Sequence, residues 1–348
     1  MKKYKFYTKT SEAWRGMHEA IVNAKESILL ESFILINDKK TRYIFDALEK
    51  KAKEGLKVVV IADAVGSFTL GSSIRKPLEK AGAEVLSFRR WLYRNHRKVL
   101  VIDKSIAFIG GVNFSGKYSE WFDLHLKTNK KTLIRYTLRS FAKVYSLAGG
   151  KDKEILALKE GKEIKPRSEK TKQWFIDHWP IRGTRALKDY YEKSCKEAKE
   201  SITIVTPYFI PHRWLIKSLR AAKKRKIKIE VILPERTDSW FTTVANFAFA
   251  SELENEIEFF FVSEMNHAKI FLVDKKEGLI GSNNIDAQSF DFNLEVSIHV
   301  ERKDMVHDLY RIIENWKINS KSLKKAYSSL PIYYKAIRPI IKLFQPIL

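Results

Sequence analysis

One pattern of five residues occurs twice in this chain of 348 residues, and it constrains the fold more than any other feature. Each copy has a histidine, a lysine two residues later, an aspartate, a glycine and an asparagine. The first copy comprises His96, Lys98, Asp103, Gly110 and Asn113, and the second comprises His267, Lys269, Asp274, Gly281 and Asn284. All five members are displaced by 171 residues. A displacement that stays constant indicates an internal duplication.

The residues around each histidine predict a strand. The apolar runs Val99–Ile102 and Ile270–Val273 are rich in β-branched residues, as in buried strands. Because side chains alternate along a strand, a histidine and a lysine two residues apart should face the same way. The glycine ends a second apolar stretch, where it permits a close backbone approach, and the asparagine follows in a turn.

The residue types suit phosphoryl chemistry. Two ammonium groups and two amides match a tetrahedral phosphoryl group, whose negative charge is spread over several oxygens. Two imidazoles suit a double displacement, in which one attacks phosphorus and the other protonates the leaving oxygen. Both can serve near neutral pH. We expect no metal and no cofactor, because the lysines supply the positive charge.

This pattern resembles that of the phospholipase D superfamily, which is defined by paired H-x-K-x4-D motifs. The segments Arg94–Lys98 and Thr206–Pro211 are similar to those of its bacterial cardiolipin synthase branch. The resemblance covers the chain from about Ser27 to about Val300. It implies a phosphatidyl-histidine intermediate that an alcohol or water resolves.

The resemblance also implies roles for individual residues. His96 is expected to be the nucleophile, and His267 the general acid and then the general base. Phosphate is expected to contact Lys98, Lys269, Asn113 and Asn284. Glu295 is expected to orient His96, and Asp123 to orient His267, because the family carries an acidic residue at these places. Asp103 and Asp274 complete the catalytic motifs, and we expect them to hold structure through hydrogen bonds or ion pairs.

The order of the predicted elements favours an α/β fold. Each half reads β-α-β-α-β, and the predicted strands Leu56–Asp63 and Ile227–Leu233 occupy matching places. We therefore expect two similar lobes, with mixed sheets flanked by helices, whose half-sites form one active site. The predicted divisions are a first lobe with a helical connector at 1–165, a second lobe at 166–325 and an apolar, basic tail at 326–348.

The net charge of +24 predicts an anionic partner, either a membrane surface or nucleic acid. The segment Phe88–Arg94 interleaves aromatic and basic residues, which suits a lipid interface but equally suits stacking on single-stranded bases. The tail segment Leu330–Phe344 suits an interfacial anchor. With one cysteine, no signal peptide and no apolar run approaching ~18 residues, the expected location is the cytoplasmic side of a membrane, as a peripheral protein.

These observations together predict a phosphatidyltransferase that transfers a phosphatidyl group to the free hydroxyl of phosphatidylglycerol, as in cardiolipin synthases. Three alternatives remain open at this point. One is a hydrolytic phospholipase D, and another is a phosphodiesterase or endonuclease that acts on nucleic acid. The third is a basic membrane-binding scaffold without activity, which is disfavoured because no motif residue is missing.

Overall fold

The computed structural model describes residues 3–160, 175–180, 183 and 185–330. The predicted C-terminal anchor therefore lies almost wholly outside the described residues. The chain divides into two compact units. The first comprises Met1–Asp177 together with Leu294–Val296, and the second comprises His178–Asn293 and Ser297–Leu348. Each unit is an α/β domain with a mixed sheet, as the sequence predicts.

The sheet of the first unit has seven strands in the order β1-β8-β7-β6-β2-β3-β4. The strands β2, β3 and β4 run parallel to one another, while β6, β7, β8 and β1 pair in antiparallel fashion. Their bounds are β1 Tyr4–Lys9, β2 Ser27–Ser32, β3 Lys57–Asp63, β4 Glu84–Phe88, β6 Lys98–Ile102, β7 Ile106–Gly110 and β8 Phe122–Thr128.

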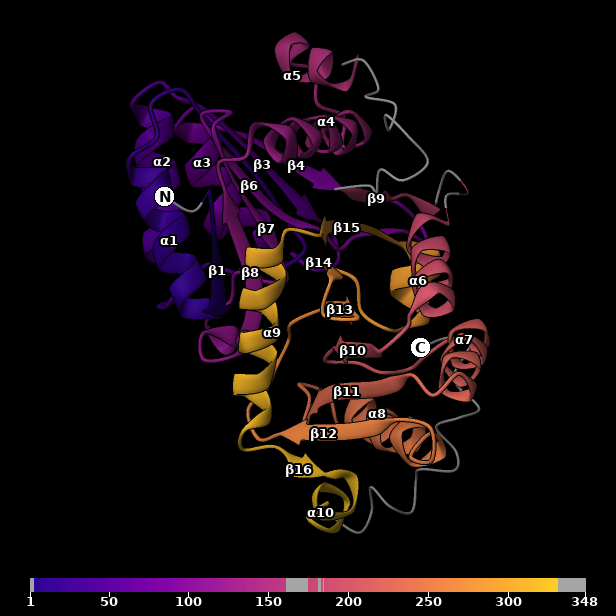
Figure 1. Cartoon of the computed structure of the whole chain (residues 1–348). Helices are drawn as coiled ribbons and strands as arrows, with labels where there is room; N and C mark the ends of the chain where they lie inside the picture. Colours follow the sequence, from indigo (N-terminus) through magenta and orange to yellow (C-terminus); the bar gives the residue numbers. More distant parts are fainter. Residues whose placement is uncertain (1–2, 161–174, 181–182, 184, 331–348) are drawn as a thin grey trace. The chain divides into compact units, whose positions relative to one another are not determined.

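Helices cover both faces of this sheet (Figure 1). The helices α1 (Thr10–Val22), α2 (Arg42–Lys53) and α3 (Lys76–Lys80) pack on one face, where alternate strand residues such as Leu30 and Val60 join them in one apolar core. Helix α4 (Lys131–Leu147) contacts β4, β6 and β7, and the short helix α5 (Lys153–Ala157) follows it. Burial on both faces explains why these strands read as continuous apolar runs.

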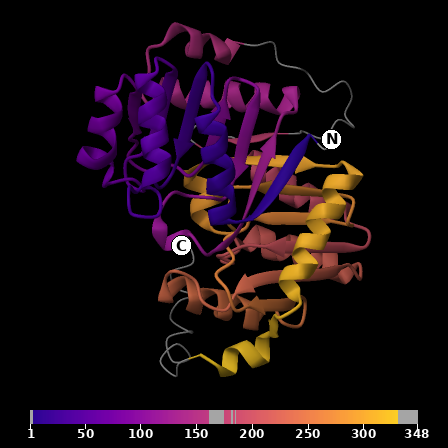
Figure 2. The ribbon, with the colours of Figure 1, turned by 90° about the vertical axis from the view of Figure 1, so that its left-hand side faces the viewer.

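The second unit repeats this arrangement. Its strands follow the order β16-β12-β11-β10-β13-β14-β15, and β10, β11 and β12 are parallel. The strand bounds are β10 Ser201–Val205, β11 Lys228–Pro234, β12 Glu258–Val262, β13 Ile270–Val273, β14 Glu277–Gly281, β15 Asn293–Val300 and β16 Lys321–Ser322. Its helices are α6 Ala186–Glu197, α7 Arg213–Lys224, α8 Trp240–Glu252, α9 Lys303–Lys317 and α10 Leu323–Ser328. Figure 2 shows α9 as the long yellow helix.

Three residues near the start of β15 belong to the first unit although they follow the second motif in the sequence. These are Leu294–Val296. Strands β5 (Arg94–Asn95) and β9 (Ile176–His178) both pair with β15. The amide of His96 donates a hydrogen bond to the carbonyl of Leu294 at 3.1 Å. A segment of the second sequence repeat thus becomes part of the surroundings of the first histidine.

The two motif histidines lie just before the strands in which the alternation of side chains was expected to place them. Strand β6 begins at Lys98 and strand β13 at Ile270, so that His96 and His267 lie in the preceding segments. The alternation expected from His96 to Lys98 is therefore not that of a regular strand. The physical reason is that the amide of His96 pairs with β15 instead of continuing the ladder of β6.

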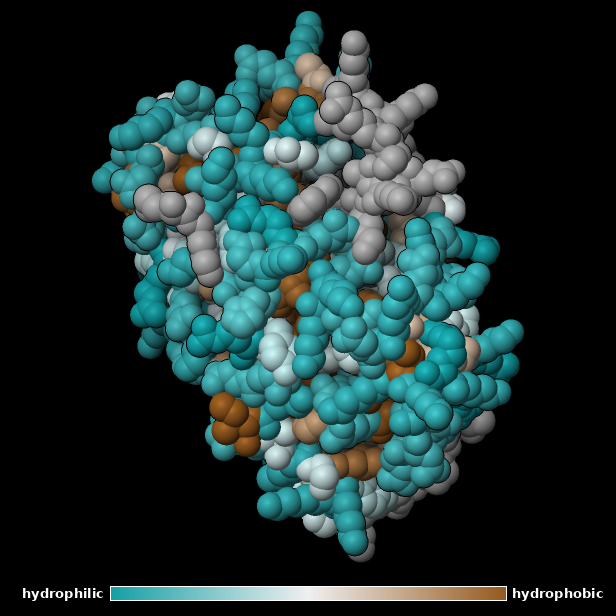
Figure 3. All heavy atoms as spheres, viewed as in Figure 1, coloured by the Kyte–Doolittle hydropathy of each residue, from teal (hydrophilic) through white to brown (hydrophobic). Residues whose placement is uncertain are grey.

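No helix among the described residues is both long enough and apolar enough to span a membrane. The face of the molecule seen in Figure 3 is mostly hydrophilic, with small, scattered apolar patches. This surface is consistent with the large excess of lysine and arginine over acidic residues, 65 against 41.

Candidate active site

The first half-site, which we define as His96, Lys98 and Asn113, is built around a buried histidine. His96 is 7% exposed, and its Nδ1 atom lies 2.9 Å from Oε1 of Glu295, whose side chain is fully buried. A carboxylate at Nδ1 favours the tautomer that carries its proton there, which leaves Nε2 as the basic, nucleophilic nitrogen. The structure thus brings together two residues that are 199 positions apart in the sequence.

The ammonium group of Lys98 contacts the backbone of this histidine. Lys98 is 1% exposed, and its Nζ donates a hydrogen bond to the carbonyl oxygen of His96. The same Nζ lies 5.2 Å from the ring centroid of Phe33, and that ring meets the imidazole of His96 edge-on at 4.9 Å. One aromatic ring therefore contacts both the imidazole and the ammonium, which restricts the positions of both.

Asn113 is also buried, and both its side chain and its backbone hold neighbouring segments. Its side-chain oxygen accepts the amide of Ile34 at 3.3 Å, and its carbonyl accepts the indole N–H of Trp14 at 3.0 Å. These contacts fix the loop after β2 against the turn that follows β7. The Asn113 amide nitrogen is the part of this side chain that remains suited to a phosphate oxygen.

A buried ionic network lies behind the first half-site. Arg97 is fully buried, with its Nε 3.4 Å from Glu31 and its Nη1 3.6 Å from Asp177. Burial raises the pKa of Glu31, and the Arg97 charge opposes this rise. Burial would also raise the pKa of Asp177, but Arg97, Lys143 and a hydrogen bond from Ser140 hold that pKa below its ordinary value. Such a network is costly to break because each charge has lost its water.

The second half-site, which we define as His267, Lys269 and Asn284, has the same local frame. His267 is 6% exposed, and its carbonyl oxygen accepts a hydrogen bond from the Lys269 ammonium. The ring of Tyr208 meets the imidazole of His267 edge-on at 6.4 Å. Ala268 is buried at the place that Arg97 occupies in the first copy. The repeated lysine-to-carbonyl hydrogen bond shows that each lysine folds back on its own histidine.

Asn284 differs from Asn113 in its contacts. Its backbone amide donates to the hydroxyl of Ser289 at 2.9 Å. Its side-chain oxygen is buried and has no hydrogen-bond partner among the residues that the structure describes. A buried amide in this state can bind a polar substrate group without first breaking a protein hydrogen bond.

The two motif aspartates have matching structural roles. The Asp103 carboxylate accepts the amides of Lys25, Glu26 and Ser27 at 2.8–2.9 Å, and these hydrogen bonds hold its pKa below the ordinary value against the opposing effect of burial. Asp274 accepts the amides of Lys199, Glu200 and Ser201 at 2.7–3.1 Å. Each aspartate ties the start of a parallel strand to the hairpin after the motif strand.

Each of these hairpins turns through two residues with positive φ, as a type I′ turn requires. The residues are Asp103 and Lys104 in the first unit, and Asp274 and Lys275 in the second, with φ between 49° and 52°. Aspartate tolerates this left-handed conformation better than most residues. The motif aspartate thus serves both as a turn residue and as a hydrogen-bond acceptor.

Two residues that sequence reasoning missed hold the loops beside the histidines. Ser67 donates to the carbonyl of Phe33 at 2.8 Å and accepts the amide of Leu35 at 2.9 Å. In the second unit, Asn246 donates to the carbonyl of Pro207 at 2.8 Å and accepts the amide of Phe209 at 2.7 Å. An asparagine in the otherwise apolar stretch Val244–Ala250 of helix α8 is a sequence signal that could have revealed the second of these contacts.

Strand β8 carries Asp123, the acidic residue expected to orient His267. Asp123 is 2% exposed, and its carboxylate accepts the amide of Leu124 at 2.7 Å. The proposed orienting role remains a prediction.

His125 lies two residues further along the same strand and is buried. Burial lowers the pKa of His125 to about 4, so this imidazole is neutral at physiological pH. Its Nδ1 accepts the amide of Val112 at 3.4 Å, directly beside Gly110, where a Cβ atom would collide with the backbone of Leu124.

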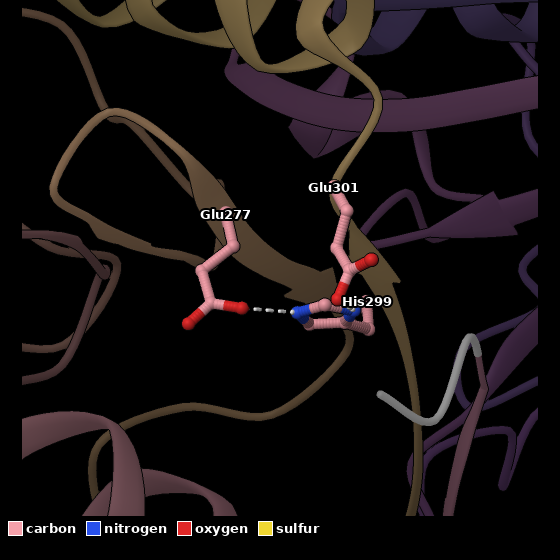
Figure 4. A group of neighbouring side chains, drawn as sticks. All are labelled: Glu277, His299 and Glu301. Carbon is pink, nitrogen blue, oxygen red and sulfur yellow. Dashed lines mark hydrogen bonds and ion pairs between the residues drawn. The ribbon is translucent and has the colours of Figure 1, made fainter. Parts of the chain in front are cut away.

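One further cluster in the described part of the chain could hold a metal ion (Figure 4). Nε2 of the buried His299 lies 3.0 Å from Glu277, and its Nδ1 lies 3.7 Å from Glu301. The cluster lies at the start of β14 and the end of β15 and contains no motif residue. Imidazole and carboxylates are general ligands of divalent metals, but the same contacts also satisfy a buried histidine as ordinary ion pairs.

The chain matches a family model described as "Cardiolipin synthase, PLD-like domain" over residues 17–145 and again over residues 192–316. It is 29% identical to cardiolipin synthase 1 of Bacillus anthracis over 372 aligned residues, which cover 99% of this chain and 72% of that protein. It is also 29% identical to a cardiolipin synthase of Listeria welshimeri, with 94% of this chain and 72% of the relative covered.

Among solved structures, the fold is similar to that of a phosphatidylserine synthase from Haemophilus influenzae. The TM-score is 0.77 at 15% identity, and the match covers 99% of this chain and 95% of the other. A polyphosphate kinase from Porphyromonas gingivalis has a TM-score of 0.63 over 97% of this chain and 56% of its own length. These likenesses concern the fold. The paired motifs, the two similar units and the two matches to one family model together show that the chain belongs to the cardiolipin synthase, phospholipase D-like domain family.

Proposed function

We propose that the protein is a phosphatidyltransferase that works through a phosphohistidine, and that its product is cardiolipin. The observation that carries the proposal is the contact of 2.9 Å between His96 Nδ1 and Glu295. A buried carboxylate at this atom prepares Nε2 for attack on phosphorus. The same contact recruits a residue of the second sequence repeat to the first histidine, which supports joint action of both motifs on one substrate.

The reaction proceeds in two displacements. In the first, Nε2 of His96 forms a bond to the phosphorus of a phosphatidyl donor, and the bond from phosphorus to the headgroup oxygen breaks. The leaving alkoxide takes a proton from His267. In the second, the hydroxyl of the acceptor loses its proton to His267 while its oxygen attacks phosphorus and releases His96. With phosphatidylglycerol as donor and acceptor, the products are cardiolipin and glycerol.

The positive charge for both transition states comes from Lys98 and Lys269 in this proposal. Both side chains are nearly fully buried, so their charges act at low effective dielectric, where they stabilise a developing phosphoryl charge more strongly than in water. The buried amides of Asn113 and Asn284 add hydrogen bonds. A metal ion is not needed for this chemistry, and we propose that the enzyme works without one, as a peripheral protein at the cytoplasmic side of the membrane.

Incubation with phosphatidylglycerol vesicles, followed by mass spectrometry of the lipids, tests this proposal. Cardiolipin and glycerol should appear in equal amounts, and excess EDTA should leave the rate unchanged. Phosphatidic acid as the main product would establish the hydrolytic alternative instead. Cleavage of oligonucleotides without any lipid product would establish the nuclease alternative, and loss of activity in EDTA with recovery on Zn²⁺ or Mg²⁺ would contradict metal independence.

Glu295→Gln tests the orienting carboxylate. The substitution keeps the shape of the side chain but removes the negative charge at His96 Nδ1, and we expect kcat to fall about 10²- to 10⁴-fold with little change in KM. Glu301→Gln is a matched control, because Glu301 lies 3.7 Å from Nδ1 of His299, a histidine outside both motifs. A Glu295→Gln enzyme with full activity would remove the orienting role.

A further inference from the structure

The loops that follow β3 and β4 expose four large apolar side chains in the first unit. Phe68 is 79% exposed and Val65 is 54% exposed in the first loop, and Trp91 is 91% exposed and Leu92 is 56% exposed in the second. We call Val65, Phe68, Trp91 and Leu92, together with the exposed Arg89 and Arg90, the apolar-basic rim. Single exposed apolar residues are ordinary, but four on two adjacent loops are not.

The two loops are neighbours because the strands before them are paired. Strands β3 and β4 are parallel neighbours in the sheet (Figure 1). Asp63 lies opposite Phe88, and the amide of Ala64 donates to the carbonyl of Phe88 at 3.0 Å. Both loops therefore leave the sheet at the same edge. The rim is one continuous feature of the first unit and does not depend on the placement of the second.

One buried carboxylate ties both loops to the first half-site. Oδ1 of Asp63 accepts the amides of Val65 and Gly66 at 2.9 Å, and its Oδ2 accepts the amide of Asn95 at 2.8 Å. Asn95 immediately precedes His96 in the chain. These hydrogen bonds hold the rim at a fixed position relative to the proposed nucleophile. A surface that presents lipid to this histidine needs such a fixed position.

The loop after β4 is closed by contacts within the loop itself. Arg94 donates from Nη1 to the carbonyls of Arg90, Trp91 and Tyr93 at 3.2–3.4 Å, which closes the loop on itself. The two loops, residues 64–70 and 89–94, contain three arginines and no carboxylate. Their charge is complementary to an anionic surface and to no cationic one.

We propose that the apolar-basic rim is the surface that docks the enzyme on an anionic phospholipid bilayer. Tryptophan sits at the level of the headgroups, phenylalanine, valine and leucine bury in the acyl boundary, and arginines bind the lipid phosphates. Nucleic acid would use the charge and the flat rings, but it offers little apolar surface for Val65 and Leu92. The inference rests on the proposed function, because a phosphatidyl substrate must be taken from a bilayer.

The test compares three variants of the full chain in sedimentation with vesicles. Phe68→Ser with Trp91→Ser should lower partition onto phosphatidylglycerol vesicles about tenfold or more. Arg89→Gln with Arg90→Gln should lower partition onto phosphatidylglycerol vesicles but leave the weaker binding to phosphatidylcholine unchanged. Ile318→Ser is the matched control, because Ile318 is 73% exposed but follows α9 in the second unit, and its partition should equal that of the unaltered protein.

Activity on detergent-dispersed phosphatidylglycerol separates docking from chemistry. The rim variants should retain full activity there and lose activity on vesicles in proportion to their lost binding. Unchanged vesicle binding by the Phe68→Ser, Trp91→Ser variant would refute the rim as the docking surface, even if the enzyme makes cardiolipin. The unaltered protein could also make no lipid product while the Phe68→Ser, Trp91→Ser variant binds vesicles less than it does. That result would support the rim as the docking surface and refute the proposed reaction. Loss of single-stranded oligonucleotide binding with vesicle binding intact would overturn the rim in favour of a nucleic-acid surface.

Discussion

The two half-sites share a frame but differ in what surrounds it. In both, a lysine folds back on the histidine carbonyl, and an aspartate accepts three backbone amides in a positive-φ turn. Around the first half-site, however, Glu31 faces Arg97 in the interior, whereas Val205 and Ala268 occupy the corresponding buried places in the second. The registers that define this correspondence pair Glu31 with Val99, and Val205 with Ile270.

This difference separates the contacts that recur in both units from those that vary. The histidine, lysine and aspartate recur with the same backbone contacts, as the reaction that we propose would require. The supporting contacts are interchangeable, because any well-satisfied arrangement can hold a loop: a serine braces the loop after β2, and an asparagine braces the loop after β10. The loop after β4, which carries Trp91 and Leu92, has no aromatic counterpart in the second unit, since the corresponding segment Ser263–Met265 contains no aromatic residue.

The largest expected effect tests whether the two histidines have different roles despite their similar frames. His96→Ala and His267→Ala should each lower turnover roughly 10⁴-fold or more, because nucleophile and acid act as a unit. Rapid quenching with labelled phosphatidylglycerol should trap a phosphohistidine in His267→Ala and none in His96→Ala. Trapping in the opposite variant would reverse the assignment, and activity in both variants would end the two-histidine mechanism.

A second prediction converts the buried surroundings of the first half-site into those of the second. Arg97→Ala alone leaves Glu31 buried without its opposing charge, and we expect it to lower the free energy of unfolding by about 3–5 kcal/mol. Arg97→Ala with Glu31→Val should cost clearly less than the single change, as judged by urea denaturation in a double-mutant cycle. Lys53→Ala, which removes an exposed ion pair with Glu49, is the control and should have little effect. Additive costs would show that the two side chains are not coupled.

The smallest expected effect is on the pH dependence of the free energy of unfolding. It comes from His125, whose counterpart in the second unit is a serine. His125 lies opposite Gly110, and Ser297 lies opposite Gly281. Burial lowers the pKa of His125 from 6.5 to about 4, so the folded state holds it neutral while the unfolded state protonates below about pH 6.5. The stability contribution is therefore complete above pH 6.5 and is lost progressively as the pH falls from about 6.5 to about 4.

Between pH 7.5 and pH 4.5, this one group should remove about 2–3 kcal/mol from the free energy of unfolding. His125→Ser, which copies the second unit, should reduce the pH dependence by that amount, whatever its effect at pH 7.5. His307→Ser, at an exposed position on α9, should leave the pH dependence as it is. Equal pH dependence in all three proteins would show that His125 is not buried in neutral form.

The sequence alone determined the duplication, the α/β class and the identity of the motif residues. The motif recurs with a constant displacement of 171 residues, and the spacings within each copy are short. The position of the lysine relative to the histidine, and of the aspartate in its hairpin turn, therefore depends only on a short stretch of chain. Apolar runs located the strands well: the predicted strand Leu56–Asp63 differs by one residue from β3, and Ile227–Leu233 differs by one residue at each end from β11. The regular alternation expected from His96 to Lys98 was wrong, because periodicity does not register that the amide of His96 pairs with another strand.

Only the tertiary structure decided which residues support the motifs. Resemblance suggested that Glu295 would serve His96, but the distance of 2.9 Å depends on Leu294–Val296 joining the first unit. Three supporting contacts cannot be found from sequence periodicity, because each joins segments whose separation in the chain follows no pattern. They are made by Ser67, by Asn246 and by the pair of Arg97 and Glu31. The rim likewise appears only when β3 and β4 pair, because parallel strands bring together loops that are separated in the chain by a helix.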